Sequence, residues 1–299
     1  MSYHSPMRMI KASILLVIML SFIFSANESD TFAFAEGAFS LAHADKKDSG
    51  SFLTLAPGME LGEFSSKTKK ASSDPDITIL RIDPSRWQLK LLSLSGTGES
   101  DCMTVKEWCA KYNIVAGINA GMFADNYSTH IGYMKCGNDV NNSKVNSYKS
   151  AAAFSPKVKG IPPFRIFDLD KTDISTIKKQ YDCVIQNLRL IKHPGVNVWG
   201  QQEKKWSEVA LGEDKSGRAL FIFCRTPYSM RDLNDILLSL PIELVCAQHL
   251  EGGPEAQMYV KVGKTEIERA GSFETGFTED KENRSVWAIP NVIGIFEKD

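Results

Sequence analysis

The sequence lacks a strong excess of either charge, and this lack argues against one class of partner. It has 35 Lys and Arg against 36 Asp and Glu, for a formal net charge of -1, and its basic residues are scattered along the chain. Proteins that bind nucleic acid need a basic face to neutralise phosphates. We therefore expect no nucleic-acid partner.

Closely spaced metal ligands are also missing. No Cys-x-x-Cys pair occurs and the 5 His lie far apart, whereas structural zinc sites use closely spaced Cys and His. We expect no metal ion and no cofactor. The six cysteines permit many disulfide connectivities in an exported chain, and the sequence favours none. They are Cys102, Cys109, Cys136, Cys183, Cys224 and Cys246. The last two lie in apolar runs and are expected to be buried free thiols.

Long hydrophobic runs are absent too, and the one near the start is short. Arg8 and Lys11 precede the apolar run Ala12–Phe24, whereas a transmembrane helix needs roughly 20 residues. The pattern predicts a signal peptide at residues 1–26, with cleavage as late as Ala44 as a variant. An uncleaved anchor is the alternative. We expect an exported protein, periplasmic or secreted, that meets the membrane only through this leader.

The rest of the chain divides by composition. Residues 27–75 are rich in Ser, Ala, Gly, Asp and Lys and are predicted to be a loosely structured lead-in, with some strand near Phe52 to Leu55. Residues 76–299 have the pattern of one folded domain. At 43% hydrophobic and 24% charged residues, the chain can bury a sizeable core.

A first strand-helix-strand unit is predicted early in the domain. A strand covers 87–94, and Thr104 with Glu107 forms a capping box that begins a helix ending near Tyr112. The apolar run 114–118 then predicts a buried strand.

A second unit of the same kind follows later. The apolar strand 219–224 precedes a helix with apolar residues at helical spacing from Met230 to Leu240, which Pro241 ends, and 243–250 is the next strand. Such a unit favours a right-handed parallel crossover. We therefore expect an α+β or mixed α/β fold, with a mixed β-sheet and helices.

Parallel crossovers would bring three loops together. The loops that follow the predicted strands begin at Asn119, Arg225 and Glu251. Ligands bind outside the carboxyl ends of parallel strands, so these loops are expected to converge. The inference fails if the strands are antiparallel.

Two of these loops carry candidate chemistry. Asn119 offers a donor and an acceptor, and Gly121 permits a positive φ; the alternative is an ordinary structural turn. Glu251 is placed as a catalytic carboxylate, and Gly252 and Gly253 can turn backbone amides toward an anion. The alternative is a tight loop with a solvated Glu.

Other polar residues are candidates for substrate or phosphate binding. Arg225 ends a strand and can hold phosphate through its guanidinium fork, and Asn187 and Arg189 form a polar cluster beside an apolar run. The alternative for each is a solvated surface residue, which is the more usual role of such residues at strand ends and turns. His249 is more often packed than catalytic in such a position. Two tryptophans, Trp199 and Trp206, suit either sugar stacking or the core.

Several blocks in this order together resemble the phosphodiester glycosidase family, from about residue 76 to the C-terminus. They are Gly117-Ile118-Asn119-Ala120-Gly121-Met122-Phe123, Ala210-Leu211-Gly212 with Asp214-Lys215-Ser216-Gly217, the predicted helix from Met230 to Leu240, Leu250-Glu251-Gly252-Gly253, and Ile289-Pro290-Asn291-Val292-Ile293-Gly294. This chain resembles a divergent, bacterial-type member. The family usually has Asp where Glu251 stands and often has Arg where Glu208 stands.

The resemblance implies a hydrolase that cleaves a sugar-1-phosphodiester. It implies a carbohydrate or glycosyl-phosphate substrate, with Glu251 as the carboxylate and Asn119 orienting the substrate. It also implies that Arg225 and the amides of Gly252 and Gly253 hold the phosphate. Glu208 would weaken a phosphate pocket if it lay there. Two rivals remain: a non-catalytic envelope protein that binds glycan or phosphate-bearing polymer, and a structural partner in the envelope.

Overall fold

A computed structural model describes residues 50–65, 76–272 and 286–298. These residues all belong to one unit, Lys46–Asp299. The predicted signal peptide lies outside the described residues. Within them, no helix combines the length and the apolar character needed to cross a membrane.

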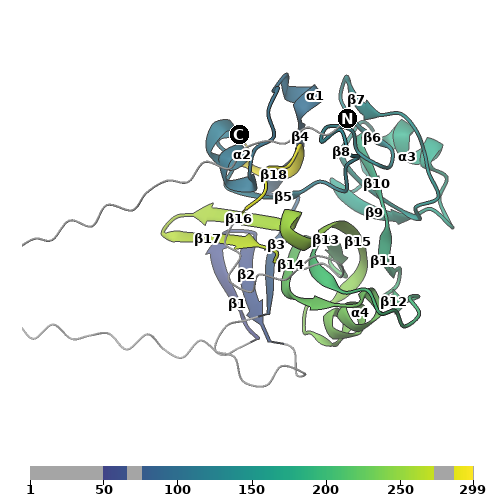
Figure 1. Ribbon diagram of the computed structural model, residues 1–299. Helices are drawn as coiled ribbons and strands as arrows, with labels where there is room; N and C mark the ends of the chain where they lie inside the picture. The colour runs from purple at the N-terminus through teal and green to yellow at the C-terminus, as the bar shows by residue number, and fades with distance from the viewer. Residues whose placement is uncertain (1–49, 66–75, 273–285, 299) are drawn as a thin grey trace, which may run out of the picture. The chain divides into compact units, whose positions relative to one another are not determined.

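The largest sheet has eight strands in the order β1-β2-β3-β14-β13-β15-β11-β12 (Figure 1). Their bounds are β1 Phe52–Ala56, β2 Met59–Phe64, β3 Ile77–Ile82, β11 Arg189–Lys192, β12 Val196–Asn197, β13 Trp206–Asp214, β14 Ala219–Tyr228 and β15 Leu244–Gly252.

Two five-stranded sheets complete the β structure of the residues described. One has the order β17-β16-β5-β18-β4 and the other β7-β6-β10-β8-β9. The bounds are β4 Trp87–Ser93, β5 Ala116–Asn119, β6 Met134–Cys136, β7 Asp139–Asn142, β8 Ser150–Pro156, β9 Phe164–Asp168, β10 Tyr181–Asn187, β16 Gln257–Val262, β17 Thr265–Ala270 and β18 Asn291–Glu297.

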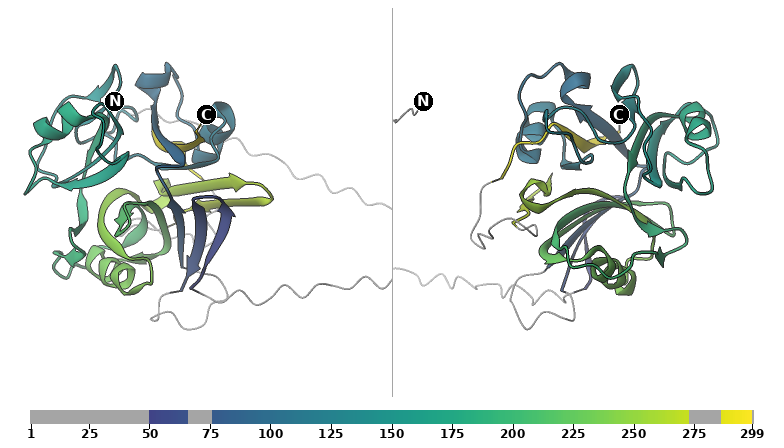
Figure 2. Two further views of the ribbon diagram at one scale, coloured as in Figure 1. Left: turned by 180° about the vertical axis from the view of Figure 1, so that it is seen from behind. Right: turned by 45° about the vertical axis from the view of Figure 1, so that its right-hand side comes forward.

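The helices are few, and one packs against each sheet (Figures 1 and 2). The helical segments are α1 Leu94–Thr97, α2 Val105–Tyr112, α3 Ile174–Gln180, α4 Met230–Ser239 and the short 3-10 turn η1 Gly253–Glu255. The capping box of Thr104 and Glu107 is confirmed at the start of α2. Ser229 caps α4 by accepting from the Asp232 N–H, and Pro241 follows the end of that helix.

The expectation of a mixed sheet is wrong, because every strand pair among the described residues is antiparallel. In each predicted strand-helix-strand unit, an antiparallel strand lies between the two strands. β13 separates β14 from β15, and β18 separates β4 from β5. The two outer strands of each unit still run in the same direction. The carboxyl ends of β14 and β15 therefore lie at one edge, together with the amino end of β13.

The predicted lead-in also needs correction. β1 and β2 pair onto β3 and form the edge of the large sheet. Met59, Leu61 and Phe64 are buried against the core, and this burial holds strands in a segment whose composition alone indicated loose structure. The folded domain therefore includes residues before the boundary at residue 76.

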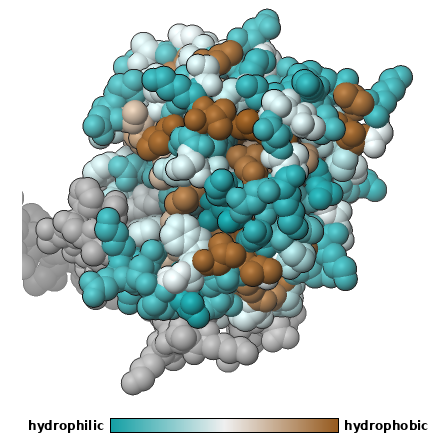
Figure 3. Space-filling view, turned by 90° about the vertical axis from the view of Figure 1, so that its right-hand side faces the viewer, coloured by the Kyte–Doolittle hydropathy of each residue, from teal (hydrophilic) through white to brown (hydrophobic). Residues whose placement is uncertain are grey.

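The main core joins all three sheets. It contains Leu80 and Phe221 from the large sheet, Ile118 and Ile293 from the second and Ile185 from the third. A second cluster lies between the large sheet and α4. On the face shown in Figure 3, hydrophobic side chains form several groups among hydrophilic ones.

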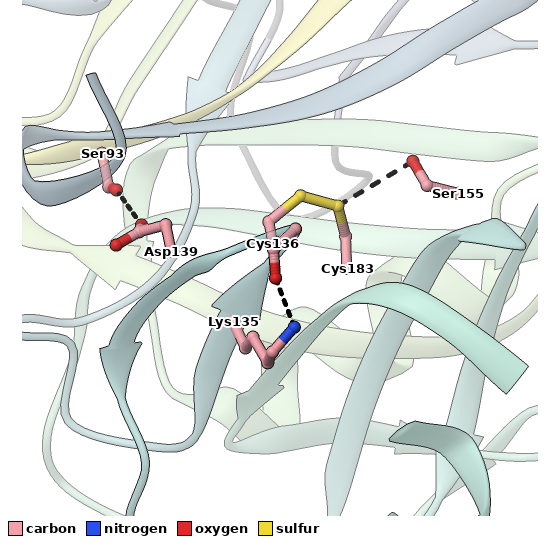
Figure 4. The surroundings of a disulfide bond; sticks show 7 residues. Ser93, Lys135, Cys136, Asp139, Ser155 and Cys183 are labelled. Atoms are coloured by element: carbon pink, nitrogen blue, oxygen red, sulfur yellow. Dashed lines mark hydrogen bonds between the residues drawn. A yellow bond between two sulfur atoms is a disulfide. The ribbon is translucent and has the colours of Figure 1, made fainter. Parts of the chain in front are cut away.

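A disulfide between Cys136 and Cys183 joins the neighbouring strands β6 and β10 (Figure 4). No sequence pattern favoured this pair, whose two cysteines are 47 residues apart along the chain. Cys224 and Cys246 are buried and take no part in a disulfide, as predicted.

Replacing both Cys136 and Cys183 by Ser is expected to lower the free energy of unfolding by about 2–4 kcal/mol, because the cross-link restricts the unfolded chain. Urea denaturation followed by fluorescence measures the change. Cys102→Ser is the matched control, since Cys102 is a free, half-buried thiol. Equal stability of the double variant and the control would contradict the prediction.

Candidate active site

A cavity of about 620 Å³ opens at the edge where β15 ends and β13 begins. This volume is typical of small-molecule sites. Its lining comes from the loop after β5, from β13 and β15, from α4 and from η1. The lining residues are Met122, Phe123, Ala124, Asp125, Tyr127, Leu188, Lys204, Trp206, Met230, His249, Glu251, Gly252 and Glu255.

Glu251, predicted as the catalytic carboxylate, lines this cavity near the end of β15. Burial raises the pKa of Glu251 to about 8, because removal from water penalises the ionised form. His249 and the Gly252 N–H, which donates to Glu251 Oε1 over 3.0 Å, oppose this rise. The carboxylates of Glu255 and Glu208 add to it. Glu251 is therefore mainly a neutral acid at pH 7 and can donate a proton.

This raised pKa predicts a pH-dependent effect of Glu251→Gln on stability. Between pH 4.5, the ordinary pKa, and about 8, the folded protein keeps a proton that the unfolded chain releases. Rising pH in this window therefore destabilises the wild type through this group. The variant, which has no such proton, should gain stability relative to the wild type from pH 5 to pH 8.5 in urea denaturation. If the difference in unfolding free energy between Glu251→Gln and the wild type did not change with pH, the raised pKa of Glu251 would be contradicted.

Glu208 lies between Cys224 of β14 and Gly252 of β15 in the large sheet. Its side chain is buried, with only 1% of the residue exposed. Trp206 Nε1 donates to Glu208 Oε2 over 2.6 Å, and His249 Nδ1 lies 2.6 Å from Oε1. Both carboxyl oxygens of Glu208 therefore contact nitrogen atoms of neighbouring side chains.

Aromatic side chains form much of the cavity wall. Phe123 and Tyr127 lie with ring centroids 5.5 Å apart, and Trp206 packs edge-on against His249 at 6.2 Å. Gly252 makes room for Trp206, because a Cβ at this position would lie 2.7 Å from the indole. Aromatic faces of this kind suit the apolar faces of sugar rings.

Asn119, the other predicted catalytic residue, is buried at the end of β5 and does not line the cavity. Its Nδ2 donates to the Glu255 carbonyl over 2.9 Å, and its Oδ1 accepts from the Gln257 N–H over 2.8 Å. These two bonds fix the end of the loop that begins at Glu251. Gly253 begins η1 and is also buried outside the lining.

Gly121 and Asn187 meet behind the loop that forms one cavity wall. Asn187 Nδ2 donates to the Ala120 carbonyl over 3.0 Å. Gly121 has a φ of 154°, and a Cβ there would lie 2.5 Å from both Asn187 Oδ1 and His130 Cε1. Both residues shape the loop and neither belongs to the lining.

The two predicted phosphate-binding arginines contact other groups and lie outside the lining. Arg225 donates to the Ala270 carbonyl over 2.8 Å. Arg189 forms ion pairs with Asp168 at 2.6 Å and with Asp170 at 2.7 Å. The structure therefore brings Glu251 and Gly252 together in the cavity, without these two cations in its wall.

Sequence reasoning undervalued His249 and Trp206 and did not single out Tyr127 or Lys204. Two sequence features could have indicated these cavity residues. His249 precedes Glu251 by two residues on one strand, and the aromatic residue Phe123 follows Gly121 closely. Trp199 is not part of the lining; its indole donates to the Arg189 carbonyl. Across the described ranges, no group of His, Cys, Asp and Glu has the arrangement of a metal site.

The fold and the cavity define the class of protein: an antiparallel β-sheet domain with an aromatic-walled cavity that carries the carboxyl of Glu251. The family model of phosphodiester glycosidases matches residues 112–296. The chain belongs to this family.

Solved structures show the same fold at low sequence identity. One is the catalytic domain of a zebrafish N-acetylglucosamine-1-phosphodiester alpha-N-acetylglucosaminidase, auto-inhibited by its pro-peptide; the TM-score is 0.57 at 15% identity, over 84% of this chain and 87% of that one. Another is a hypothetical protein from Synechocystis, with a TM-score of 0.56 at 12% identity, over 83% and 64%. No curated protein matches the sequence.

Proposed function

We propose that the protein is a hydrolase that cleaves the bond between the anomeric carbon of a sugar and a phosphodiester. The observation that carries the proposal is Glu251, a cavity carboxyl with a pKa of about 8 beside aromatic walls. Membership of the phosphodiester glycosidase family supports the same chemistry. The substrate is a glycosyl phosphodiester whose sugar ring packs against the aromatic side chains.

The neutral form of Glu251 suits an anionic substrate. An ionised carboxylate would repel the phosphodiester, whereas the protonated acid donates a hydrogen bond to a phosphate oxygen. A water oxygen forms a bond to the anomeric carbon as the carbon–oxygen bond to phosphate breaks. The phosphate leaves with the electron pair, Glu251 supplies a proton to it, and the proton of the water passes to solvent. A phosphate is already a good leaving group, with a second pKa of about 6, so the proton contributes less than in ordinary glycoside hydrolysis.

The test is turnover of a panel of glycosyl phosphodiesters by the purified protein. The first substrate is an N-acetylglucosamine 1-phosphodiester, the group named for the zebrafish relative; sugars of other configuration follow. Released reducing sugar and phosphate monoester in equal amounts support the proposal. A preparation that binds these compounds without releasing sugar contradicts it.

A second candidate is a non-catalytic protein that binds glycan or phosphate-bearing polymer. It is favoured by the carboxyls of Asp125 and Glu255 in the lining and by the positions of Arg225 and Arg189 outside it. Binding of a glycan fragment in calorimetry, with no product formed, would support this candidate.

Export is the second part of the proposal. The apolar run Ala12–Phe24 supports it, and so does the Cys136–Cys183 disulfide, because such bonds persist in oxidising compartments. Amino-terminal sequencing of the protein from its native host is the test, with residue 27 expected as the first residue. An intact amino terminus in the cytoplasmic fraction would contradict export.

A further inference from the structure

A second cavity, of about 580 Å³, lies at the edge of the large sheet opposite the candidate active site. The candidate site opens where β13 begins and β15 ends, whereas the second cavity lies where β13 ends and β15 begins. Its lining comes from the β3–β4, β11–β12 and β13–β14 turns, from β9 and from the loop before β9. Among the described residues, none lines both cavities. The volume of the second cavity is typical of a small-molecule site.

Prolines form the apolar part of the second cavity's wall. Pro84 comes from the β3–β4 turn, Pro162 and Pro163 from the loop before β9, and Pro194 from the β11–β12 turn. Val245 of β15 adds a further apolar side chain. The ring of a proline fixes φ, so such a wall is largely preorganised before a ligand binds. It suits the apolar ring or chain of a small organic molecule.

Three basic side chains line the same cavity from three separate segments. Arg165 lies on β9, His193 in the β11–β12 turn and Lys215 in the β13–β14 turn. Lys215 is exposed. Lys298 adds a further positive charge nearby, since its Nζ donates to the carbonyls of Pro84 and Ser85 over 2.8 Å.

Two carboxyls in the lining are buried and already paired within the protein. Glu213 is 2% exposed; its Oε1 lies 3.0 Å from Arg165 Nε, and its Oε2 accepts the Ile166 N–H over 2.7 Å. Asp214 is 1% exposed and accepts from the backbone N–H of Arg218 over 2.9 Å and from its Nε over 2.6 Å. Both carboxylates therefore have their donors before any ligand arrives.

The third carboxyl and Arg165 complete the charge pattern of the lining. Asp83 accepts from the Ser85 N–H over 2.8 Å and from the Ser85 hydroxyl over 2.6 Å. Arg165 contacts Glu213 through Nε, yet 40% of its side chain is exposed. The buried Glu213 therefore holds Arg165 in the cavity wall while part of its side chain stays accessible. Since the carboxyls already have donors, the basic groups are the ones left to meet a ligand, and they match an anion.

We propose that the second cavity is a binding site for a small organic anion, a phosphate or carboxylate group carried on an apolar ring or chain. Lys215 and Arg165 contact the anionic group, His193 lies beside them, and the prolines pack against the apolar part. The site binds its anion whether or not the protein hydrolyses phosphodiesters, because it shares no described residue with the candidate active site.

Four small probes separate charge from apolar contact in NMR titrations of the wild type. Phenyl phosphate or benzoate is expected to shift the amide signals of residues 215–217 saturably and to bind at least about 10-fold more tightly than benzyl alcohol, which has the ring without the charge. Phenyl phosphate and benzoate distinguish the phosphate from the carboxylate source. Inorganic phosphate, which has no ring, should bind more weakly than phenyl phosphate; equal affinity would overturn the role of the prolines. Equally tight binding of benzyl alcohol, or no saturable shift of residues 215–217 with about 10 mM of either organic anion, would overturn the site.

Variants in the same titration test the basic residues. Lys215→Gln is expected to weaken binding of the anion about 10-fold, whereas Lys264→Gln, which removes an exposed lysine from the β16–β17 turn, should leave the affinity unchanged. Arg165→Lys keeps a positive charge beside Glu213 but loses the planar fork, so it should also weaken binding. Wild-type affinity in both folded Lys215→Gln and folded Arg165→Lys would overturn the site. Shifts confined to the Gly252 amide would place the anion in the candidate active site and overturn it as well.

Discussion

Replacing Glu251 by Gln is expected to lower kcat about 100-fold at pH 7 while KM changes little. A general acid typically raises the reaction rate by roughly 10²–10⁴-fold. We expect the lower end of this range here, because phosphate is a good leaving group. Gln can still donate a hydrogen bond to phosphate, so binding persists without proton transfer. Initial rates of sugar release from a glycosyl phosphodiester measure the change.

The conservative variant and the pH profile sharpen this prediction. Glu251→Asp keeps a titratable carboxyl and should retain more activity than Glu251→Gln. Wild-type kcat should fall as pH rises through about 8, where Glu251 loses its proton, and Glu251→Gln should lack this limb. If Glu251→Gln were as active as the wild type, Glu251 would have no catalytic role.

Replacing Asn119 by Ala is expected to lower the free energy of unfolding by about 1–3 kcal/mol, the cost of leaving one buried group unpaired. The variant removes the acceptor of the Gln257 N–H, and it leaves the Glu255 carbonyl with the Gln257 Nε2 donor at 3.3 Å. Since these bonds fix the loop that begins at Glu251, kcat/KM should fall at least about 10-fold as the acid loses its position. Urea denaturation and initial rates measure the two effects.

Two further variants test whether the hydrogen bonds themselves matter at Asn119. Asn119→Asp keeps the acceptor for Gln257 but places an oxygen against the Glu255 carbonyl, so it should also destabilise. Asn138→Ala is the surface control, because Asn138 is exposed in the β6–β7 turn, and should change stability by less than about 0.5 kcal/mol. Wild-type stability of Asn119→Ala would show that the loop is held by other contacts.

Local features of the fold were predictable because they depend on residues close in sequence. The capping box at Thr104 and the cap at Ser229 begin helices where expected. The order of strands was not predictable in this way. β13 precedes β14 in a hairpin, yet it also pairs with β15 beyond the helix α4, and no short-range pattern encodes that second pairing.

The residues of the candidate site also fall into two groups: those that local sequence patterns identified and those whose contacts such patterns did not predict. Glu251 and Gly252 were found from a strand followed by glycines, and both line the cavity. Asn119 was predicted to orient the substrate because it lies at a strand end. In the structure its side chain instead forms hydrogen bonds to the backbone of Glu255 and Gln257. Arg225 and Arg189 were chosen by charge, and charge in a sequence does not say which carbonyl or carboxylate a guanidinium will meet.

The sequence by itself determined the alternation of strands and helices, the glycine loop after Leu250 and the family blocks, because backbone preference and short motifs act over a few residues. Only the tertiary structure decided that Glu208 contacts His249, 41 residues further along the chain, and that Cys136 reaches Cys183. Both contacts depend on which strands become neighbours. The burial of hydrophobic faces from three sheets in one core fixes that choice for the whole domain at once.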